Sequence, residues 1–324
     1  MMPRNFALIG AAGYIAPRHM KAIYDTGNQL VAATDPHDAV GILDRYSMNV
    51  RFFPEIERFD RHIEKLRRGP EDQRVHYITI CSPNYLHDAH IRLALRTDTD
   101  AICEKPVVIN PWNLDALEVI ENETGHSVFT ILQLRLHPAL LDLKIRLDES
   151  KHDRKRDVLL TYITGRGAWY GVSWKGSETK SGGIAINIGI HLFDLLIWLF
   201  GNVESVQLHD RSPSRMSGFI ELKNANVRWF LSIDAEDILE SMTAPATPNA
   251  STLRVMTVDG EVLHFSEGFT DLHSKVYEQT LAGRGFRIAD ARPSIELAYA
   301  IRSSHPAWNE DTVHPCLKNL KLSQ

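Results

Sequence analysis

The feature that most constrains the fold is a regular alternation of short apolar runs with amphipathic stretches over the first 130 or so residues. The runs have the length of buried strands, and the stretches have the period of helices. Apolar strands that alternate with helices are typical of a parallel sheet covered on both faces. We therefore predict a doubly wound α/β domain. Its expected strands are residues 6–9, 29–34, 75–81, 101–103 and 128–132, with helices at 15–26, 87–96 and 111–124 and an irregular region after the second strand.

The second half of the chain has a different pattern, in which strands follow one another directly. Asp259-Gly260 is a strong hairpin signal because both residues tolerate positive φ. Strands joined by tight turns form an antiparallel sheet, so we predict an α+β second domain. The expected strands are residues 157–165, 203–209, 215–222, 226–234, 252–258 and 261–265. The expected helices are a buried one at 185–200 and two that close the chain at 270–282 and 290–303.

Bulk properties exclude several classes of protein. At 324 residues, with 44% hydrophobic and 24% charged residues, the chain is long and apolar enough for two globular domains. The net charge of −5 gives no reason to expect a nucleic-acid or membrane partner. We expect no signal peptide and no spanning segment, because polar residues interrupt the most apolar stretch, 184–200. Cys81 and Cys103 end apolar runs and fit buried thiols, so we expect a cytoplasmic protein without a cysteine metal site.

A glycine-rich turn, Gly-Ala-Ala-Gly-Tyr-Ile-Ala at residues 10–16, follows the first predicted strand and opens the first predicted helix. Glycines let the backbone turn tightly and approach a pyrophosphate, whose charge then lies at the helix N-terminus. The pattern departs from G-x-G-x-x-G: with Gly13 as the second glycine, Ala11 and Ala16 stand at the first and third, and Gly10 is displaced by one. Taken alone, the turn is explained equally well by simple packing.

Asp35 makes a dinucleotide the better explanation of that turn. It ends the second predicted strand, 22 positions after Gly13, where a carboxylate can accept hydrogen bonds from the adenosine ribose. The same carboxylate would repel a 2′-phosphate, and no Arg or Lys follows in residues 36–38, so NAD is preferred over NADP. The alternative is that Asp35 only begins a turn before Pro36. A second turn, Ser82-Pro83-Asn84-Tyr85-Leu86-His87, follows a strand end where a cofactor would lie, or it is a turn with a helix cap.

Two further motifs contain the candidate catalytic residues. Lys105, in Glu104-Lys105-Pro106 after a predicted strand, can donate hydrogen bonds and positive charge to a substrate oxygen, although a lone loop lysine is usually only solvated. Asn187 and His191 are four apart in an otherwise apolar predicted helix and would share one face. Such a pair either forms hydrogen bonds in the core or points into a site. A histidine beside a lysine ammonium has a lowered pKa and can accept a proton near pH 7.

In their order along the chain, these motifs resemble those of the Gfo/Idh/MocA oxidoreductase family: the glycine turn, S-P-N-x-x-H at 82–87, E-K-P at 104–106 and G-G-x-x-x-N-x-G-x-H at 182–191. The resemblance covers the whole chain. It implies an N-terminal Rossmann domain, residues 1–130, that binds NAD. It also implies a second domain, residues 131–324, that binds substrate and forms a homotetramer through the open face of a large, mostly antiparallel sheet.

Within this family the chain is most similar to bacterial dehydrogenases that act on UDP-N-acetylglucosaminuronate in surface-polysaccharide (O-antigen, lipopolysaccharide) biosynthesis. The residues that suggest this are 11–19, 132–138, 164–171, 181–191 and 268–273. The resemblance implies hydride removal from sugar C3, which leaves a 3-keto sugar for an aminotransferase, and in some members NAD is regenerated with 2-oxoglutarate. Many members of the broad family have Asp where this chain has Asn187, whereas Asn is expected in the narrower group.

The resemblance and the chemistry together imply roles. Lys105 and His191 would meet over the nicotinamide and flank the reacting hydroxyl, with His191 as general base and Lys105 as polarising donor, or the reverse. Asn187 completes the catalytic set. The implied cofactor-binding residues are Gly10, Gly13, Tyr14, Ile15, Asp35, Ser82, Pro83, Asn84, His87, Glu104, Lys105 and Gln133. The implied substrate-binding residues are Lys105, Arg135, Arg166, Tyr170, Lys175, Asn187, His191, Thr270 and His273.

Other functions remain open at this stage. A family member that acts on a free sugar or an inositol would retain activity on a substrate without UDP. A non-catalytic NAD-binding regulator is a second alternative, since such folds can lose their chemistry and keep the cofactor. The presence of both Lys105 and His191 argues against it. The glycine turn and Asp35 argue against a purely structural scaffold.

Overall fold

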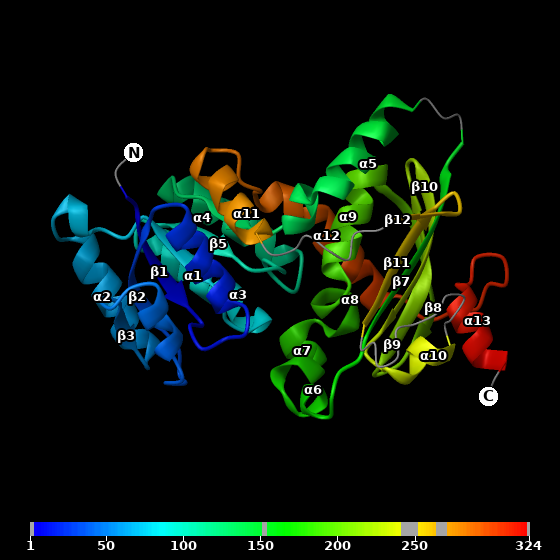
Figure 1. Ribbon diagram of the computed structural model, residues 1–324, viewed down its shortest axis with the longest axis horizontal. Coiled ribbons are helices and arrows are strands. Elements are labelled where there is room, and N and C mark those ends of the chain that lie inside the picture. The colour runs from blue at the N-terminus through cyan, green and yellow to red at the C-terminus, as the bar shows by residue number, and fades with distance from the viewer. Residues whose placement is uncertain (1–2, 151–153, 241–251, 264–270, 323–324) are drawn as a thin grey trace. The chain divides into compact units, whose positions relative to one another are not determined.

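A computed structural model of residues 1–324 describes the chain except for residues 1–2, 151–153, 241–251, 264–270 and 323–324 (Figure 1). The contacts divide the chain into two units. One comprises Met1–Leu136 and Phe269–Arg292, and the other comprises His137–Gly268 and Pro293–Gln324. A segment of the second half therefore returns to the first unit, which a single boundary between residues 130 and 131 does not anticipate.

The first unit is built on a parallel sheet with the strand order β3-β2-β1-β4-β5-β6. The strands are β1 (Asn5–Ile9), β2 (Gln29–Thr34), β3 (Arg51–Phe53), β4 (Tyr77–Ile80), β5 (Asp100–Cys103) and β6 (Val128–Thr130). All residues of β1 and β6 are buried, which accounts for their mostly apolar sequences, in which only Asn5 and Thr130 are polar. The strand order reverses between β1 and β4, and ligands bind at the carboxyl ends of strands at such a switch point. The predicted doubly wound domain is confirmed.

The helices of the first unit are α1 (Ala16–Asp25), α2 (Ile56–Arg67), α3 (His87–Arg96), α4 (Trp112–Thr124) and α11 (Leu272–Leu281). Helix α11, from the returning segment, packs beside α1 (Figure 1). Its Tyr277 stacks on Phe6 of β1 with ring centroids 5.9 Å apart, and both side chains are fully buried. The returning segment thus completes the core of this unit.

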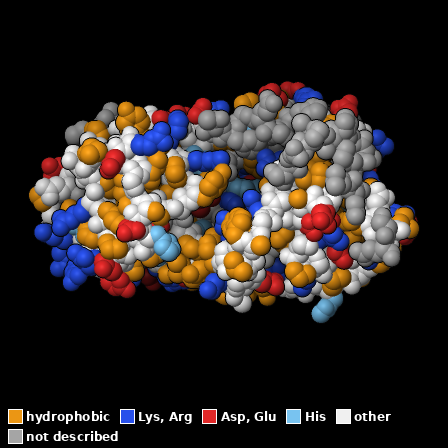
Figure 2. Space-filling model, turned by 60° about the horizontal axis from the view of Figure 1, so that its bottom comes forward, with side chains coloured by type: hydrophobic (Ala, Val, Ile, Leu, Met, Phe, Trp, Pro, Cys, Tyr) orange, Lys and Arg blue, Asp and Glu red, His pale blue; other side chains and the backbone are white. Residues whose placement is uncertain are grey.

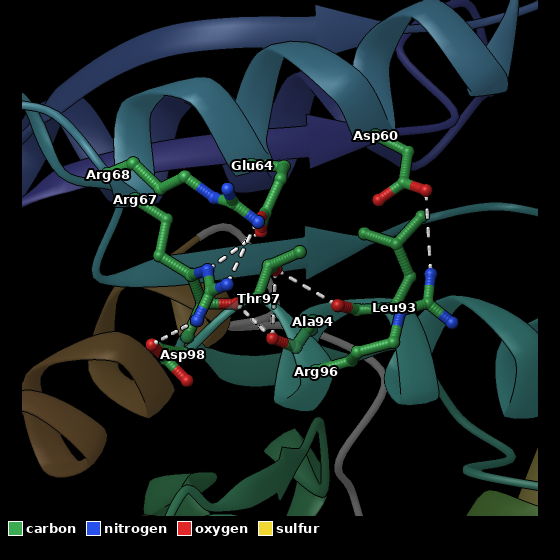
Figure 3. A network of polar contacts seen from close by, with 10 residues as sticks. Asp60, Glu64, Arg67, Arg68, Leu93, Ala94, Arg96, Thr97 and Asp98 are labelled. Carbon is green, nitrogen blue, oxygen red and sulfur yellow. Dashed lines mark hydrogen bonds and ion pairs between the residues drawn. The ribbon is translucent and has the colours of Figure 1, made fainter.

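A polar network connects the end of α2 to the end of α3 (Figure 3). Arg67 pairs with both oxygens of Glu64, at 2.7 and 2.9 Å, and reaches Asp98 at 2.9 Å. Arg68 shares Glu64, and hydrogen bonds from the two arginines lower the pKa of that carboxyl to about 2. The Thr97 hydroxyl donates to two carbonyls of the last turn of α3. Because solvent screens the charged groups, the network orients the helix ends more than it stabilises them.

The second unit is built on a sheet with the order β12-β11-β7-β10-β9-β8. The strands are β7 (Arg156–Thr164), β8 (Val203–Arg211), β9 (Arg215–Leu222), β10 (Ala225–Ser232), β11 (Thr252–Val258) and β12 (Glu261–Leu263). Neighbouring strands are antiparallel except β7 and β10, which are parallel. Asp259 and Gly260 join β11 to β12 with φ values of 51° and 85°, as a hairpin turn requires. The predicted, mostly antiparallel sheet is confirmed.

The remaining helices are α5 (Pro138–Glu149), α6 (Trp169–Val172), α7 (Glu178–Ser181), α8 (Gly183–Asn187), α9 (Ile190–Phe200), α10 (Glu236–Glu240), α12 (Ile288–Ser303) and α13 (Pro315–Leu322). A continuous helix over residues 185–200 was a wrong prediction, because the chain bends by 43° between α8 and α9. At Gly189, between them, a Cβ atom would lie 2.7 Å from the Ala185 carbonyl oxygen and 2.8 Å from Leu231 of β10. The bend occurs where the backbone approaches the sheet too closely for a side chain.

Several elements lie where the sequence analysis expects none. Strand β3 and helix α2 occupy the region expected to be irregular, α5 follows the last strand of the first sheet, and α13 follows the two helices expected to close the chain. Each of these helices buries only a few apolar residues, such as Phe59 and Ile63 of α2. Their apolar faces are too narrow to stand out from the surrounding polar sequence.

Both faces of the second sheet are covered at β10. Trp229 meets Phe193 of α9 with ring centroids 5.4 Å apart, whereas Phe230, which points the other way, packs against His314 near α13. Helix α9 is buried almost completely, which explains its nearly uniform apolar sequence.

On the face shown in Figure 2, Lys and Arg side chains gather at the left end beside a smaller group of Asp and Glu, and hydrophobic side chains are spread over the described surface. No single helix among the described residues is long and apolar enough to cross a membrane, although Glu178–Asn187 and Ile190–Phe200 pass that test together as a bent pair. Cys81, Cys103 and Cys316 are buried and free, as expected for the first two.

Candidate active site

The glycine turn lies directly against the backbone that follows β4. Gly10 has a φ of +91°, and a Cβ atom there would lie 2.7 Å from both the Cys81 carbonyl carbon and the Ser82 nitrogen. Gly13 is also crowded, since its Cβ would lie 3.1 Å from the Gly10 oxygen. Gly10, rather than Ala11, therefore makes the tight turn, which corrects the alignment with the first glycine of the motif. The turn leads into α1, which begins at Ala16.

Asp35 lies immediately after β2 and is buried. One carboxylate oxygen accepts a hydrogen bond from the Ala12 backbone N–H at 3.0 Å, and the other accepts from the His37 N–H at 2.8 Å. The carboxylate thereby joins the glycine turn to the end of β2. Each oxygen has a second lone pair, so Asp35 keeps capacity to accept from a ribose hydroxyl.

The turn after β4 and the E-K-P turn are joined through a buried histidine. His87, the first residue of α3, lies between the Ser82 carbonyl oxygen, 2.8 Å from Nε2, and the Pro106 carbonyl oxygen, 2.6 Å from Nδ1. Burial lowers the pKa of His87, although the two carbonyls oppose that shift. The Ser82 hydroxyl forms a hydrogen bond of 2.8 Å with His90. A neutral imidazole has one N–H, so His87 donates to one of these carbonyl oxygens and lies in contact with the other. It thus lies between two loops at the switch-point edge of the sheet, a position that the sequence analysis did not foresee.

Glu104, directly after β5, is at the centre of a buried cluster. Its Oε1 atom lies 3.0 Å from Nε2 of His19 and 3.1 Å from Nε2 of His273. His19 Nδ1 is 2.9 Å from the Tyr277 hydroxyl, which is 2.8 Å from the Thr79 hydroxyl. These side chains come from α1, α11, β4 and the end of β5, and all of them are buried.

The cluster holds a charged carboxylate in the interior. Burial by itself raises the pKa of Glu104, but hydrogen bonds from His19 and His273 outweigh it and hold that pKa well below its usual value. Burial lowers the pKa of His19, only partly offset by Glu104, and raises the pKa of Tyr277 well above its usual range. The stable state is therefore an ionised Glu104 beside a neutral His19 and a neutral Tyr277.

Lys105 is half-buried and follows Glu104 immediately. Its backbone N–H donates to the Oε2 atom of Glu104 at 3.2 Å, and the Lys105–Pro106 peptide bond is cis. Gln133 and Arg135 follow β6 in a 3-10 turn. The Arg135 guanidinium is engaged by Asp290, at 3.3 Å from the carboxylate and 3.0 Å from the carbonyl oxygen, and it lies over the Phe286 ring. These contacts orient the Arg135 side chain within the first unit, and its predicted contact with substrate stays a prediction.

In the second unit, Asn187 ends α8 and His191 is the second residue of α9, so the bend at Gly189 separates them. Their spacing had suggested that both lie on one regular helix, and that prediction is wrong. The Asn187 amide donates to the Tyr170 hydroxyl oxygen at 2.7 Å. Burial raises the pKa of Tyr170, so its phenol keeps a proton that it can donate. The structure thus brings together two of the predicted substrate-binding residues.

The segment between β7 and α7 carries the other predicted substrate-binding residues of this unit. Arg166 is exposed, and Lys175 Nζ lies 5.2 Å from the Trp169 ring and 5.6 Å from the Trp174 ring. These rings can stabilise the ammonium through their π faces. Thr270 lies outside the described residues.

Sequence reasoning missed the roles of His19 and Tyr277. A usable signal was present. His19 lies on the buried face of the short helix α1, together with apolar residues such as Met20. A buried histidine needs polar partners, so its position indicated a hydrogen-bonded cluster. The partner helix, α11, lies more than 250 positions away, so spacing along the chain could not reveal the cluster.

The fold and these features define the class of oxidoreductases that bind NAD through an N-terminal Rossmann domain. Two family models match: the NAD-binding Rossmann fold of the Gfo/Idh/MocA oxidoreductases at residues 4–131, and the C-terminal alpha/beta domain of the same family at residues 156–238. The chain belongs to the Gfo/Idh/MocA oxidoreductase family.

Solved structures give a narrower similarity. The chain is 48% identical to the WlbA (WbpB) dehydrogenase from Thermus thermophilus, with a TM-score of 0.90 over 96% of this chain and 99% of that chain. That enzyme has been crystallised with NAD and alpha-ketoglutarate and with NAD and UDP-GlcNAcA. Among curated relatives, a D-glucoside 3-dehydrogenase of Escherichia coli is 27% identical over 64% of this chain. That match spans 57% of the relative's length. A separate match, to an oxidoreductase from Bacillus subtilis, spans 42% of that relative's length.

Proposed function

We propose that this protein uses NAD to oxidise the C3 hydroxyl of UDP-N-acetylglucosaminuronate to a 3-keto sugar, in the biosynthesis of surface polysaccharide such as O-antigen. The observation that carries the proposal is the 48% identity, over nearly the full length of both chains, to an enzyme crystallised with NAD and UDP-GlcNAcA. The curated relative named as a 3-dehydrogenase supports the position of oxidation.

The first unit fits NAD. Gly10 and Gly13 leave two positions of the turn before α1 without side chains, so that its backbone can approach a pyrophosphate at the helix N-terminus. Asp35, with an acceptor lone pair remaining on each oxygen, would hold the adenosine ribose and disfavour a 2′-phosphate. We assign the nicotinamide end to residues that follow the next strands. They are Ser82, Pro83, Asn84, Glu104, Lys105 and Gln133, with Tyr14 and Ile15 at the glycine turn.

Lys105 and His191 supply the acid–base chemistry in this proposal. When bound, NAD accepts a hydride from the sugar carbon. The Lys105 ammonium donates a hydrogen bond to the reacting hydroxyl oxygen and favours the developing alkoxide. His191 accepts the hydroxyl proton, and Asn187 orients the substrate together with the Tyr170 hydroxyl that it contacts.

The segment around Trp169 would recognise the charged parts of the substrate. Arg166 and Lys175 bring positive charge to it, and an arginine can pair with two oxygens of a carboxylate or a diphosphate at once. We further propose that 2-oxoglutarate is a second substrate that regenerates NAD, by analogy with the crystallised complex of the Thermus thermophilus enzyme.

We also propose a homotetramer assembled through the second sheet and a cytoplasmic location. Strand β8, at one edge of that sheet, keeps seven of its nine residues partly or fully exposed, as a surface that pairs with another copy would. The buried free thiols Cys81 and Cys103 fit a reducing compartment. Light scattering coupled to size-exclusion chromatography tests the tetramer, and a monomer at micromolar concentration would contradict it.

The proposal is tested by incubating the protein with UDP-N-acetylglucosaminuronate and 2-oxoglutarate and analysing the products by mass spectrometry. We expect bound NAD on denaturation, a nucleotide sugar two mass units lighter, and 2-hydroxyglutarate. Lys105→Ala should reduce turnover by at least about 100-fold and leave the NAD content unchanged. Equal turnover in this variant would remove Lys105 from the mechanism, and absence of the lighter nucleotide sugar with the wild type would refute the assigned substrate.

A second candidate function is oxidation of a free sugar or glycoside, which the similarity to a D-glucoside 3-dehydrogenase favours. In that case the protein would turn over glucosides without UDP at least as well as the nucleotide sugar. A comparison of kcat/KM for the two substrate classes decides between the candidates.

A further inference from the structure

The buried cluster around Glu104 has a single consistent direction of hydrogen bonding. Glu104 is ionised and can only accept, so the Nε2 atom of neutral His19 carries the proton that it donates to Oε1. His19 Nδ1 must then accept from the Tyr277 hydroxyl, which in turn accepts from the Thr79 hydroxyl. Every proton in this chain points toward Glu104, so the chain orients and neutralises one carboxylate.

His273 serves the same carboxylate from another element. Its Nε2 atom lies 3.1 Å from the oxygen that His19 contacts, and the two imidazoles meet edge to face. Its Nδ1 atom is buried and has no hydrogen-bond partner among the residues that the structure describes. Within the first unit, the polar function of the His273 ring is therefore its contact with Glu104.

Glu104 transmits this constraint to the catalytic turn. Its Oε1 atom is occupied by the two histidines, and its Oε2 atom accepts the backbone N–H of Lys105 at 3.2 Å. On the other side of the lysine, His87 lies 2.6 Å from the Pro106 carbonyl oxygen. The backbone on both sides of Lys105 is thus held by buried side chains, whereas the lysine side chain itself is half-exposed.

We propose that His19 and His273 are positioning residues that fix the backbone of Lys105 through the Glu104 carboxylate. The proposal rests on the proposed function in that it takes Lys105 to contact the reacting hydroxyl. It gives the returning helix α11 a part in catalysis, because α11 carries His273 and Tyr277 from a segment far along the chain to the end of β5. A displacement of about 1 Å in a catalytic group can cost about 100-fold in rate, so a fixed turn matters.

The same three side chains, His19, Glu104 and His273, have ligand atoms within 4.8 Å of one another and could in principle hold a metal ion. The geometry favours hydrogen bonds. Both imidazole Nε2 atoms lie 3.0–3.1 Å from a single carboxylate oxygen, a distance at which each N–H donates directly, whereas a metal would need both nitrogens deprotonated. A metal is therefore an outcome that the test must exclude.

Glu104→Gln separates positioning of Lys105 from packing of α11. The amide oxygen can still accept from both histidines, but the amide N–H₂ group then faces the Lys105 N–H, and a donor meets a donor. His273→Ala removes one support, and His273→Gln restores a donor of similar reach. His314→Gln is the matched control, since His314 is an equally buried, hydrogen-bonded histidine in the second unit, contacting Thr161 at 3.2 Å.

We expect Glu104→Gln and His273→Ala to lower kcat and kcat/KM by the same factor, about 10- to 100-fold, with the KM for the nucleotide sugar unchanged. The Kd for NAD should be unchanged in His273→Ala, whose side chain is not among the residues assigned to NAD. His273→Gln should recover most of the loss, and His314→Gln should retain wild-type kcat. Wild-type kcat in Glu104→Gln would overturn the proposal. So would a raised KM with unchanged kcat in His273→Ala, which would show a direct contact with substrate, or a stoichiometric metal in the purified protein.

A readout independent of activity separates failure of this proposal from failure of the proposed function. Hydrogen exchange at the Lys105 amide, resolved to single residues, should be slow in the wild type and at least about 10-fold faster in Glu104→Gln and His273→Ala. The amide should remain slow in His314→Gln. If the wild type does not oxidise the nucleotide sugar but exchange follows this order, only the substrate assignment fails. Equal exchange in all variants refutes the positioning role whatever the substrate.

Discussion

Gly10→Ala is the most informative single substitution, because the structure predicts two separate costs. The φ of +91° is unfavourable for any residue with a Cβ, by about 1–2 kcal/mol. In addition, the new Cβ would lie 2.7–2.8 Å from the carbonyl carbon and oxygen of Cys81 and the nitrogen of Ser82, which are backbone atoms and cannot rotate away. Overpacking of this kind costs about 1–3 kcal/mol more. We expect a total loss of about 2–5 kcal/mol.

Two other glycines provide matched controls. Gly27 has a φ of +73° but nothing within 4 Å of its Cβ position, so Gly27→Ala should show the conformational cost alone. Gly41 has neither a positive φ nor a close neighbour, so Gly41→Ala should be nearly neutral. The difference between the variants at Gly10 and Gly27 isolates the contact between the glycine turn and the backbone after β4.

The assay is native-state hydrogen exchange of the β1 and β4 amides, which reports the local free energy of opening, together with NAD binding by calorimetry. Gly10→Ala should destabilise these strands more than Gly27→Ala does and weaken NAD by more than about 10-fold, because the turn must shift from where the pyrophosphate meets the helix. If Gly10→Ala lost no more stability and no more NAD affinity than Gly27→Ala, the close approach would not be what requires glycine there.

Further predictions concern the ribose site, the substrate site and a buried histidine. Asp35→Ala should weaken NAD and relax its preference over NADP, and an unchanged ratio of the two Kd values would defeat the ribose assignment. Tyr170→Phe should raise the KM for the nucleotide sugar about 10-fold, because it removes the hydroxyl that accepts from Asn187 and that can donate to the substrate. An unchanged KM would place Tyr170 outside the site. Burial lowers the pKa of His314 to about 3, so the folded second unit favours the neutral ring. The contribution of neutral His314 to the free energy of unfolding should be fully present above pH 6.5, the pKa of an unfolded histidine. It should fall by at most about 1.4 kcal/mol per pH unit from there to about pH 3, because the unfolded chain then binds a proton that the folded chain does not. In urea denaturation, His314→Gln should make this fall less steep.

The elements that could be predicted from the sequence are those whose burial is set by local pattern. Strand β2 and helix α3 match their predicted bounds, residues 29–34 and 87–96, because strong apolar periodicity and clear turns delimit them. Helix α2 was missed because only Phe59 and Ile63 of its twelve residues are buried. The parallel pairing of β7 with β10 depends on contacts between strands distant along the chain, which alternation within each strand does not encode.

The candidate site divides along the same line. The glycine turn, Asp35 and the E-K-P turn follow directly from parallel strands, since their carboxyl ends share one edge of the sheet. The bend between α8 and α9 could not be predicted, because it depends on the approach of Gly189 to Leu231 and Phe193. The support of Glu104 by His19 and His273 depends on a helix that returns from the second half of the chain.

The most direct test of the proposed reaction follows a single hydrogen atom. UDP-N-acetylglucosaminuronate deuterated at C3 should transfer its deuterium to NAD, giving deuterated NADH and, with 2-oxoglutarate present, 2-hydroxyglutarate deuterated at C2 by mass spectrometry. Substrate deuterated at C4 should give unlabelled NADH and retain its label in the product. Transfer of label from C4, or no transfer from C3 while NADH forms, would contradict oxidation at C3.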